Sequence, residues 1–192
     1  MNWGDTRSGK VAFVAHCILN HNAKVHGLAS KPCMDKRVIE VLEKNGYGIA
    51  QLPCPETTMH GLRRWWQVRE QYDTPGFREH CRRILQPTML LMAEFQRAGY
   101  SMIIIGVEGS PSCGVRFSGS SLEWLGQPRT SGSEYPIERG PGVFMSVLID
   151  EIKRWGLQQP RMTGFAAYLP GYTEDRAIKE LEEFLSAEEN NA

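Results

Sequence analysis

The chain has 192 residues, of which 41% are hydrophobic and 23% charged, and 22 Lys and Arg balance 22 Asp and Glu. This length and composition predict one globular domain over residues 1–192, and the balanced charge gives no reason to expect a nucleic-acid polymer or an anionic membrane as partner. No apolar run approaches the roughly 20 residues that span a bilayer, and the first residues lack the apolar segment of a signal peptide. We therefore expect a cytoplasmic protein, whose five cysteines are core residues, metal ligands or catalysts rather than disulfides.

Short apolar runs at four places predict the strands of a buried parallel sheet. Each run is bounded by Gly, Pro or polar residues, as is typical of strands that are covered on both faces. In chain order they are Lys10–Cys17, Tyr47–Pro53, Ser101–Glu108 and Met162–Pro170.

Helical patterns lie between these strands. The first follows Pro32 and ends at Gly46, which suits a helix C-cap. The second runs from Pro75 to Ala98, and Pro87 within it should kink or divide the helix. The third lies in the stretch from Gly140 to Gly156, and the last begins after Thr173, whose side chain can cap it.

Strands that alternate with helices predict an α/β fold, with three α/β/α layers and a mainly parallel, Rossmann-like sheet. Two segments fall outside this alternation. Ser118–Gly142 is rich in Gly, Ser and Pro, and we expect a long loop that could act as a lid. Residues 187–192 are expected to form a frayed tail.

Three of the cysteines follow the ends of three different predicted strands. Cys17 ends the first strand, Cys54 directly follows the second, and Cys113 lies a few residues beyond the third. Ligands of open parallel sheets bind beyond the carboxyl ends of the strands, so these three thiols should converge there. Cys33 and Cys81 lie elsewhere, and we expect both to be packing residues.

Two kinds of metal chemistry suit three convergent thiols. One is a zinc site that has an open position or takes a histidine as its fourth ligand, and His16 and His21 flank Cys17. The other is an iron–sulfur cluster held by three cysteines, whose remaining iron is open and acts as a Lewis acid. The spacing of the cysteines does not choose between them.

Four sequence stretches occur in the order seen in the DUF523 family, which includes a thiouracil desulfidase. They are "HCILNHNAKVHG", "CPE", "SPSCG" and "GPGVFMSVLIDEIKRWGL". From Lys10 to Leu157 the sequence therefore resembles this family. The resemblance implies a [4Fe-4S] cluster bound by Cys17, Cys54 and Cys113, whose open iron takes the sulfur of a thiolated base or nucleoside. It also implies a small-molecule substrate and loading by the iron–sulfur assembly machinery, while a homodimer stays open.

The resemblance also suggests roles for other residues. Glu56 and Ser110 occupy positions implicated in catalysis: Glu56 would orient the attacking water, and Ser110 would donate a hydrogen bond to the heterocycle. Ser112 is a second candidate for the latter role. The simpler alternatives are a carboxylate at a helix N-terminus for Glu56 and turn residues for the serines.

The N-terminal pattern departs from the family and predicts a diverged, desulfidase-related branch. Ala23 replaces a second cysteine, and His26 replaces an acidic residue. His26 is therefore a candidate for proton transfer near the substrate, or a solvated loop residue. The run Arg63–Trp66 could recognise a planar or anionic substrate, or form a helix with packed tryptophans and solvated arginines.

The sequence leaves two alternatives to a desulfidase open. One is a zinc hydrolase or an enzyme with a cysteine nucleophile, built on the same strand ends. The other is a sensor without catalytic activity, whose cluster or thiols report the redox state.

Overall fold

A computed structural model describes residues 4–128 and 134–189 of the chain. Its centre is a parallel four-stranded sheet in the order β2-β1-β3-β6, as the sequence predicts. The strands are β1 (Lys10–Ala15), β2 (Gly48–Leu52), β3 (Ser101–Val107) and β6 (Arg161–Phe165). Each strand ends before the predicted run does, because the last residues of the first run begin α1 (His16–Leu19) and those of the other three runs lie in loops and turns beyond the sheet.

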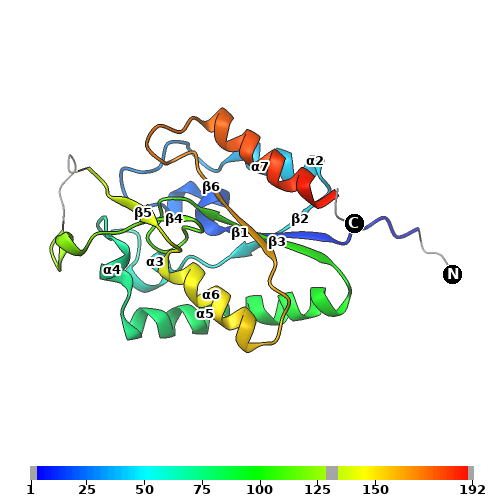
Figure 1. The fold of residues 1–192 in the computed structure, drawn as a ribbon, viewed down its shortest axis with the longest axis horizontal. Helices are drawn as coiled ribbons and strands as arrows, with labels where there is room; N and C mark the ends of the chain where they lie inside the picture. Colours follow the sequence, from blue (N-terminus) through cyan, green and yellow to red (C-terminus); the bar gives the residue numbers. More distant parts are fainter. Residues whose placement is uncertain (1–3, 129–133, 190–192) are drawn as a thin grey trace.

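Helices cover both faces of the sheet (Figure 1). α2 (Lys36–Lys44) packs beside α7 (Glu174–Glu189) on one face, and α5 (Pro75–Arg97) packs beside α6 (Val143–Arg154) on the other. This arrangement confirms the three-layer, Rossmann-like α/β architecture. The core lies between the layers, where the side chains of Ile103, Ile104 and Ile105 are completely buried. Burial of one such side chain contributes about 1.5–3 kcal/mol.

The helix signals in the sequence are confirmed in most cases. Gly46 follows α2 with a φ of +75°, and the backbone N–H of Arg176 donates to Thr173 Oγ1 at the start of α7. Of the two outcomes expected for Pro87, the division of the helix was wrong, because α5 continues through this residue undivided, while the kink stays a prediction. Leu85 and Met89 on either side of Pro87 are fully buried, so packing on the core holds the helix together there.

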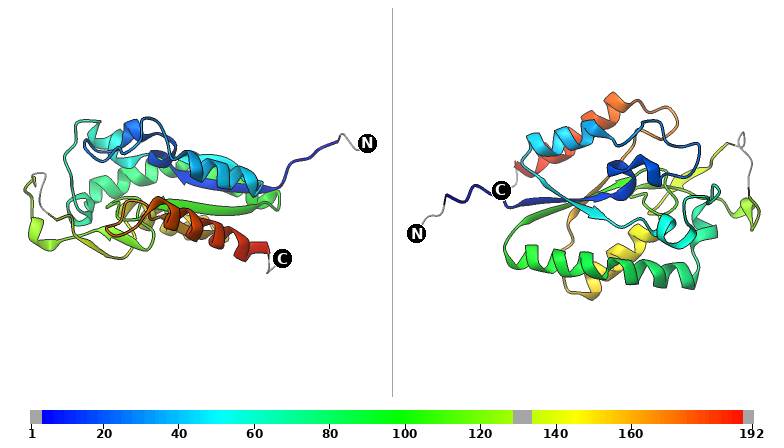
Figure 2. Two further views of the ribbon diagram at one scale, coloured as in Figure 1. Left: turned by 90° about the horizontal axis from the view of Figure 1, so that it is seen from above. Right: turned by 180° about the vertical axis from the view of Figure 1, so that it is seen from behind.

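Ser118–Gly142 is more ordered than we expected. Here β4 (Phe117–Gly119) and β5 (Ile137–Arg139) pair in antiparallel fashion, with the 3₁₀ helix η2 (Leu122–Trp124) between them. Figure 2 shows this arm extending from one end of the molecule. Residues 129–133 lie outside the described part of the chain.

The C-terminal helix is also longer than predicted. α7 continues to Glu189, because Leu181 and Leu185 keep its later turns docked on the core. Residues 190–192 of the expected tail lie outside the described residues. In the described ranges, no helix is long and apolar enough to cross a membrane.

The order of the strands determines where a ligand can bind. β1 and β3 are neighbours in the middle of the sheet, and the chain leaves them toward β2 on one side and β6 on the other. Such a switch point opens a crevice beyond the carboxyl ends of the two strands. The short helices α1 (His16–Leu19), α3 (Pro55–His60) and α4 (Arg69–Tyr72), and the 3₁₀ helix η1 (His21–Ala23), lie at this end of the fold.

Candidate functional site

The three strand-end cysteines line one cavity of about 310 Å³. Cys17 lies in α1 directly after β1, Cys54 precedes α3 after β2, and Cys113 lies in the loop after β3. All three thiols are free. The structure thus brings together the cysteines that the sequence placed at the carboxyl ends of neighbouring strands, while their role as ligands stays a prediction.

The three thiols are close enough to influence one another. Burial raises the pKa of Cys17 to about 12, the cation of Lys24 counteracts part of this rise, and Cys54 adds to it. Burial also raises the pKa of Cys113 well above its ordinary value, and both Cys17 and Cys54 contribute in the same direction. The thiols are therefore neutral near pH 7, and a metal that binds them would displace their protons.

The sulfur of Cys54 is fixed by the start of α3. Cys54 is the N-cap residue, and its Sγ accepts the backbone N–H of Thr57 at 3.4 Å. Thr57 Oγ1 lies 3.2 Å from this sulfur and donates to the carbonyl of Ala23. Pro55 occupies the first position of the helix, where no backbone N–H is required. The "CPE" motif therefore forms a helix start that presents its cysteine to the cavity.

A buried carboxylate organises the loop that carries Cys113. Glu108, whose side chain is 0% exposed, accepts the backbone N–H groups of Val115, Arg116 and Phe117, the shortest at 2.9 Å. The guanidinium Nε of Arg116 also donates to it at 2.8 Å. Nothing in the sequence analysis indicated this role, since Glu108 was read only as the last residue of a strand.

Two glycines allow this loop to pack closely. A Cβ on Gly142 would lie 2.4 Å from the carbonyl carbon of Ser112, and one on Gly114 would lie 2.1 Å from the carbonyl oxygen of Phe117. Because these neighbours are backbone atoms, they cannot give way by a change of rotamer. The glycines of "SPSCG" and of the start of α6 are therefore required by the close approach of the backbone.

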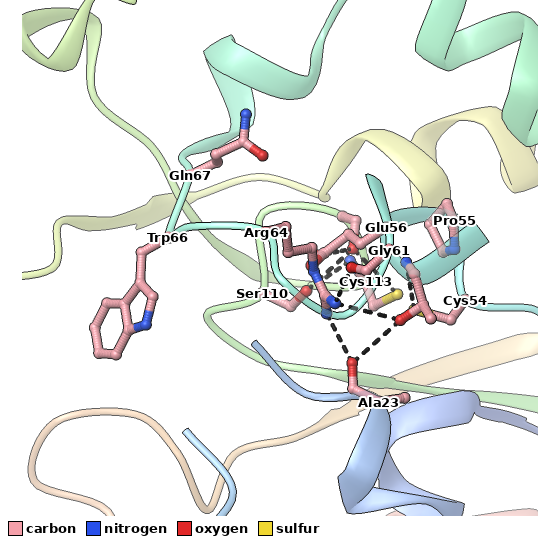
Figure 3. A network of polar contacts seen from close by, with 12 residues as sticks. Ala23, Cys54, Pro55, Glu56, Gly61, Arg64, Trp66, Gln67, Ser110 and Cys113 are labelled. Atoms are coloured by element: carbon pink, nitrogen blue, oxygen red, sulfur yellow. Dashed lines mark hydrogen bonds and ion pairs between the residues drawn. The ribbon is translucent and has the colours of Figure 1, made fainter. Parts of the chain in front are cut away.

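Glu56 lies in a polar network beside Cys113 (Figure 3). Ser112 Oγ donates to Glu56 Oε1 at 2.5 Å, and Arg64 Nε donates to Glu56 Oε2 at 2.8 Å. Arg64 also donates to the carbonyl of Ala23 at 2.8 Å. Both carboxylate oxygens are thus held by side chains that come from different segments.

The segment around Arg64 does not form the expected helix, so that interpretation was wrong, while substrate recognition by this cavity-lining segment stays a prediction. Residues 61–68 form no helix, and Arg64 is buried while Trp65 is 51% exposed. The buried ion pair with Glu56 explains this reversal, because a buried arginine requires a partner of opposite charge. The sequence suggested Arg64 as a substrate-recognition residue, but not as the partner of Glu56.

The two serines of "SPSCG" have different roles in the loop. Ser110 Oγ accepts the backbone N–H of Cys113 at 3.0 Å, so this serine closes the turn as well as lining the cavity. Ser112 Oγ lies 3.3 Å from Ser110 Oγ and 3.4 Å from the sulfur of Cys113. Ser112, the weaker candidate from the sequence, therefore has the stronger connection to Glu56.

The histidines do not join the site. His26 is exposed and is absent from the cavity lining, and its backbone carbonyl accepts the indole N–H of Trp66 at 2.9 Å. His21 is buried, and its Nε2 lies 2.9 Å from Asp35 Oδ2. His16 does not line the cavity either. The structure therefore gives no support to His26 as a substrate-binding residue, nor to His16 or His21 as a fourth ligand.

The two remaining cysteines differ from each other. Cys81 is fully buried in the core, as expected. Cys33 is exposed, so our expectation that it packs in the core was wrong. It lies in the exposed segment that precedes α2, outside the core.

Much of the cavity wall is aromatic. Its lining includes Trp65, Trp66, Tyr72, Tyr135 and Tyr168. The rings of Trp66 and Tyr135 meet edge to face, with 5.9 Å between their centroids, and Tyr135 donates to the carbonyl of Gln67. Tyr168 follows the carboxyl end of β6, a position that could have marked it in the sequence, whereas Tyr135 comes from the irregular arm and carried no such signal.

The sequence is similar to that of a known protein. An uncharacterized protein of Methanocaldococcus jannaschii, MJ0003, is 41% identical over 106 residues, which span 55% of this chain and 68% of that protein. The chain belongs to the same family. The name of this relative states no activity, so membership of the family does not identify a reaction.

The other comparisons found no match. No protein-family model matches the chain, and neither does any solved structure. The resemblance to the DUF523 family therefore depends on the four motifs quoted above.

Proposed function

We propose that the protein is a [4Fe-4S]-dependent desulfidase that removes sulfur from a small thiolated heterocycle. The observation that carries this proposal is the convergence of Cys17, Cys54 and Cys113 on one cavity, beside the Glu56 carboxylate. The net reaction replaces a thiocarbonyl sulfur by the oxygen of water and releases hydrogen sulfide. The motif resemblance to the DUF523 family supports the same assignment.

The donor set suits an iron–sulfur cluster better than a single ion. Within residues 4–128 and 134–189, no group of three His, Cys, Asp or Glu side chains is arranged to hold one metal ion. A zinc ion requires every sulfur donor at about 2.3 Å from one atom, whereas each cysteine of a cluster binds a different iron. Three thiols that line one cavity, in a described chain without a group of three donors for a single ion, therefore support the cluster and give the zinc alternative no support.

Cys17, Cys54 and Cys113 would hold the cluster as thiolates. With three cysteine ligands, a bound [4Fe-4S] cluster supplies one open iron that acts as a Lewis acid toward sulfur. The protein fixes its three ligands by the end of β1, the N-cap of α3 and the loop anchored on Glu108.

Glu56 and Ser112 would manage the proton of the attacking water. Arg64 holds Oε2 of Glu56, so the carboxylate is oriented with Oε1 toward Ser112. In this proposal Ser112 relays the proton from water to Glu56, and it lies between that carboxylate and the sulfur of Cys113. A positioned general base of this kind contributes typically 10²–10⁴-fold to a rate.

The cavity wall suits a flat ring. Aromatic side chains such as Trp66 and Tyr135 offer apolar faces and edges, while Ser110 brings a polar group to the same surface. Its volume of about 310 Å³ lies at the lower end of small-molecule sites. The substrate is therefore a compact thiolated base rather than a polymer.

Sulfide release from 2-thiouracil and related thiolated bases tests this function, measured under anaerobic conditions with the cluster-loaded protein. We expect turnover in the wild type and a 10²–10⁴-fold lower rate in Glu56→Gln at unchanged iron and sulfide content. Glu123→Gln, at an exposed residue of the arm, is the matched control. Equal rates in the wild type and Glu56→Gln would contradict the role of Glu56, and no sulfide from any thiolated base would contradict the function.

A further inference from the structure

Four charged side chains line the cavity, and Lys24 differs from the other three. Glu56 is paired with Arg64, and Glu108 is satisfied by its own loop and by Arg116. Among the described residues, Lys24 forms no ion pair with a carboxylate. The cavity therefore contains one cation whose charge is not balanced by direct contact with a protein carboxylate.

Lys24 is held on an anchored aromatic ring. Its Nζ lies 3.4 Å from the centroid of the Tyr168 ring, which is a cation–π contact. The hydroxyl of Tyr168 lies 2.6 Å from Asp35 Oδ2, and Asp35 is in turn paired with Lys31 at 3.0 Å and with His21 at 2.9 Å. The carboxylate thus fixes the ring, and the ring fixes the ammonium at the cavity wall.

Lys24 is half-buried at the cavity wall. Burial lowers the pKa of Lys24, while Cys17 and Asp35 act in the opposite direction. An ammonium that is removed from water gains most from an anion that supplies both a charge and hydrogen-bond acceptors. Because none of the described residues accepts a hydrogen bond from the amine of Lys24, a ligand carboxylate could take its donors.

We propose that Lys24, which is held on the ring of Tyr168, forms an anion subsite, so that the substrate is a thiolated heterocyclic ring that bears a carboxylate. The sulfur of this substrate rests on the proposed function, whereas its carboxylate is inferred from Lys24 alone. The choice of a ring carboxylate follows from the cavity of about 310 Å³, which would also have to admit the cluster and leaves room for one ring rather than a nucleotide. The competing role for Lys24 is to balance the charge of the cysteine thiolates.

Binding of sulfur-free analogues tests the subsite independently of turnover. The full-length, anaerobically purified protein would be titrated calorimetrically with uracil and with orotate, its ring carboxylate. We expect orotate to bind about 10–100-fold more tightly than uracil, as a charge-assisted pair that is shielded from water provides. Lys24→Met should abolish this preference, Lys24→Arg should retain most of it, and the exposed-lysine control Lys36→Met should leave it unchanged.

Several results would overturn the inference. Equal affinities for uracil and orotate in the wild type would do so, as would a preference that survives in Lys24→Met. If uridine 5′-monophosphate binds more tightly than orotate and this difference is lost in Lys24→Met, the anion that Lys24 binds is a phosphate and the ring carboxylate is wrong. A lower iron content in Lys24→Met without any change in preference would assign Lys24 to the thiolates.

The same titrations separate this inference from the proposed function. If orotate binds through Lys24 and no sulfide is released from 2-thiouracil or 2-thioorotate, the subsite stands and the desulfidase assignment fails. If 2-thiouracil and 2-thioorotate are turned over with equal kcat/KM, the desulfidase assignment stands and the subsite fails.

Discussion

The buried carboxylate of Glu108 offers a quantitative test of how the Cys113 loop is held. Glu108→Gln keeps the shape of the side chain but removes its charge and replaces one acceptor oxygen by a donor. The other oxygen still meets the three backbone N–H groups of Val115, Arg116 and Phe117, now as neutral bonds. A hydrogen bond to a charged group contributes about 1.5–3 kcal/mol and a neutral one about 0.5–1.5 kcal/mol. Each of the three bonds is therefore weakened by about 1 kcal/mol, and the free energy of unfolding should fall by about 3 kcal/mol.

This loss is large for a domain of this size. Natural domains have a free energy of unfolding of about 5–15 kcal/mol. A change of about 1 kcal/mol in this quantity shifts the Tm of a domain of 150–250 residues by about 2–4 °C. Urea unfolding followed by tryptophan fluorescence and by circular dichroism measures the difference.

Arg116→Met is the matched control for Glu108→Gln. It removes the guanidinium contacts to Glu108 and Glu180 but leaves the backbone N–H bonds to Glu108 in place. The Arg116 side chain is 49% exposed, so the expected decrease in the free energy of unfolding is below about 1 kcal/mol. A Glu108→Gln variant within about 0.5 kcal/mol of the wild type, or equal losses in the two variants, would refute the reasoning.

Three further predictions concern the same end of the fold. Gly142→Ala should destabilise the protein by more than about 2 kcal/mol in urea unfolding, because its Cβ would meet the Ser112 backbone at 2.4 Å, whereas Gly126→Ala, with nothing within 4 Å, should be nearly neutral. Ser112→Ala should retain the cluster but release sulfide about 10²-fold more slowly, and an unchanged rate would exclude the relay. Burial raises the pKa of Asp35, but the hydrogen bonds from Tyr168, His21 and Lys31 together lower it by more, so the pKa lies below its ordinary value. Because its pKa is lowered, ionised Asp35 stabilises the fold above about pH 4, and this stabilisation is lost as the pH falls. Asp35→Asn should therefore make the free energy of unfolding decrease less steeply toward acid pH. An equally steep decrease in this variant would contradict the assignment.

The fold could be predicted from the sequence because buried strands and amphipathic helices leave periodic patterns. The convergence of Cys17, Cys54 and Cys113 followed from the same reasoning, since parallel strands end at one edge of the sheet. The continuity of α5 through Pro87 could not be predicted, because tertiary packing there outweighs the local cost of proline.

The polar connections within the site were beyond sequence reasoning. Arg64 lies in a run that reads as a solvated helix, and only the buried position of Glu56 eight residues earlier explains why the arginine is buried. Glu108 closes a loop that returns to it, so its partners depend on the path of that loop. The contact of Lys24 with Tyr168 joins residues 24 and 168, which no local pattern connects.

The most direct test of the central claim is the iron and sulfide content of the anaerobically purified or reconstituted protein and of its five single Cys→Ser variants. We predict about four iron and four sulfide per chain in the wild type, as a [4Fe-4S] cluster requires. We also predict severe loss in the variants of Cys17, Cys54 and Cys113, with nearly normal content in those of Cys33 and Cys81. A colourless protein that binds zinc, or a cluster that depends on Cys33 or Cys81, would contradict the account.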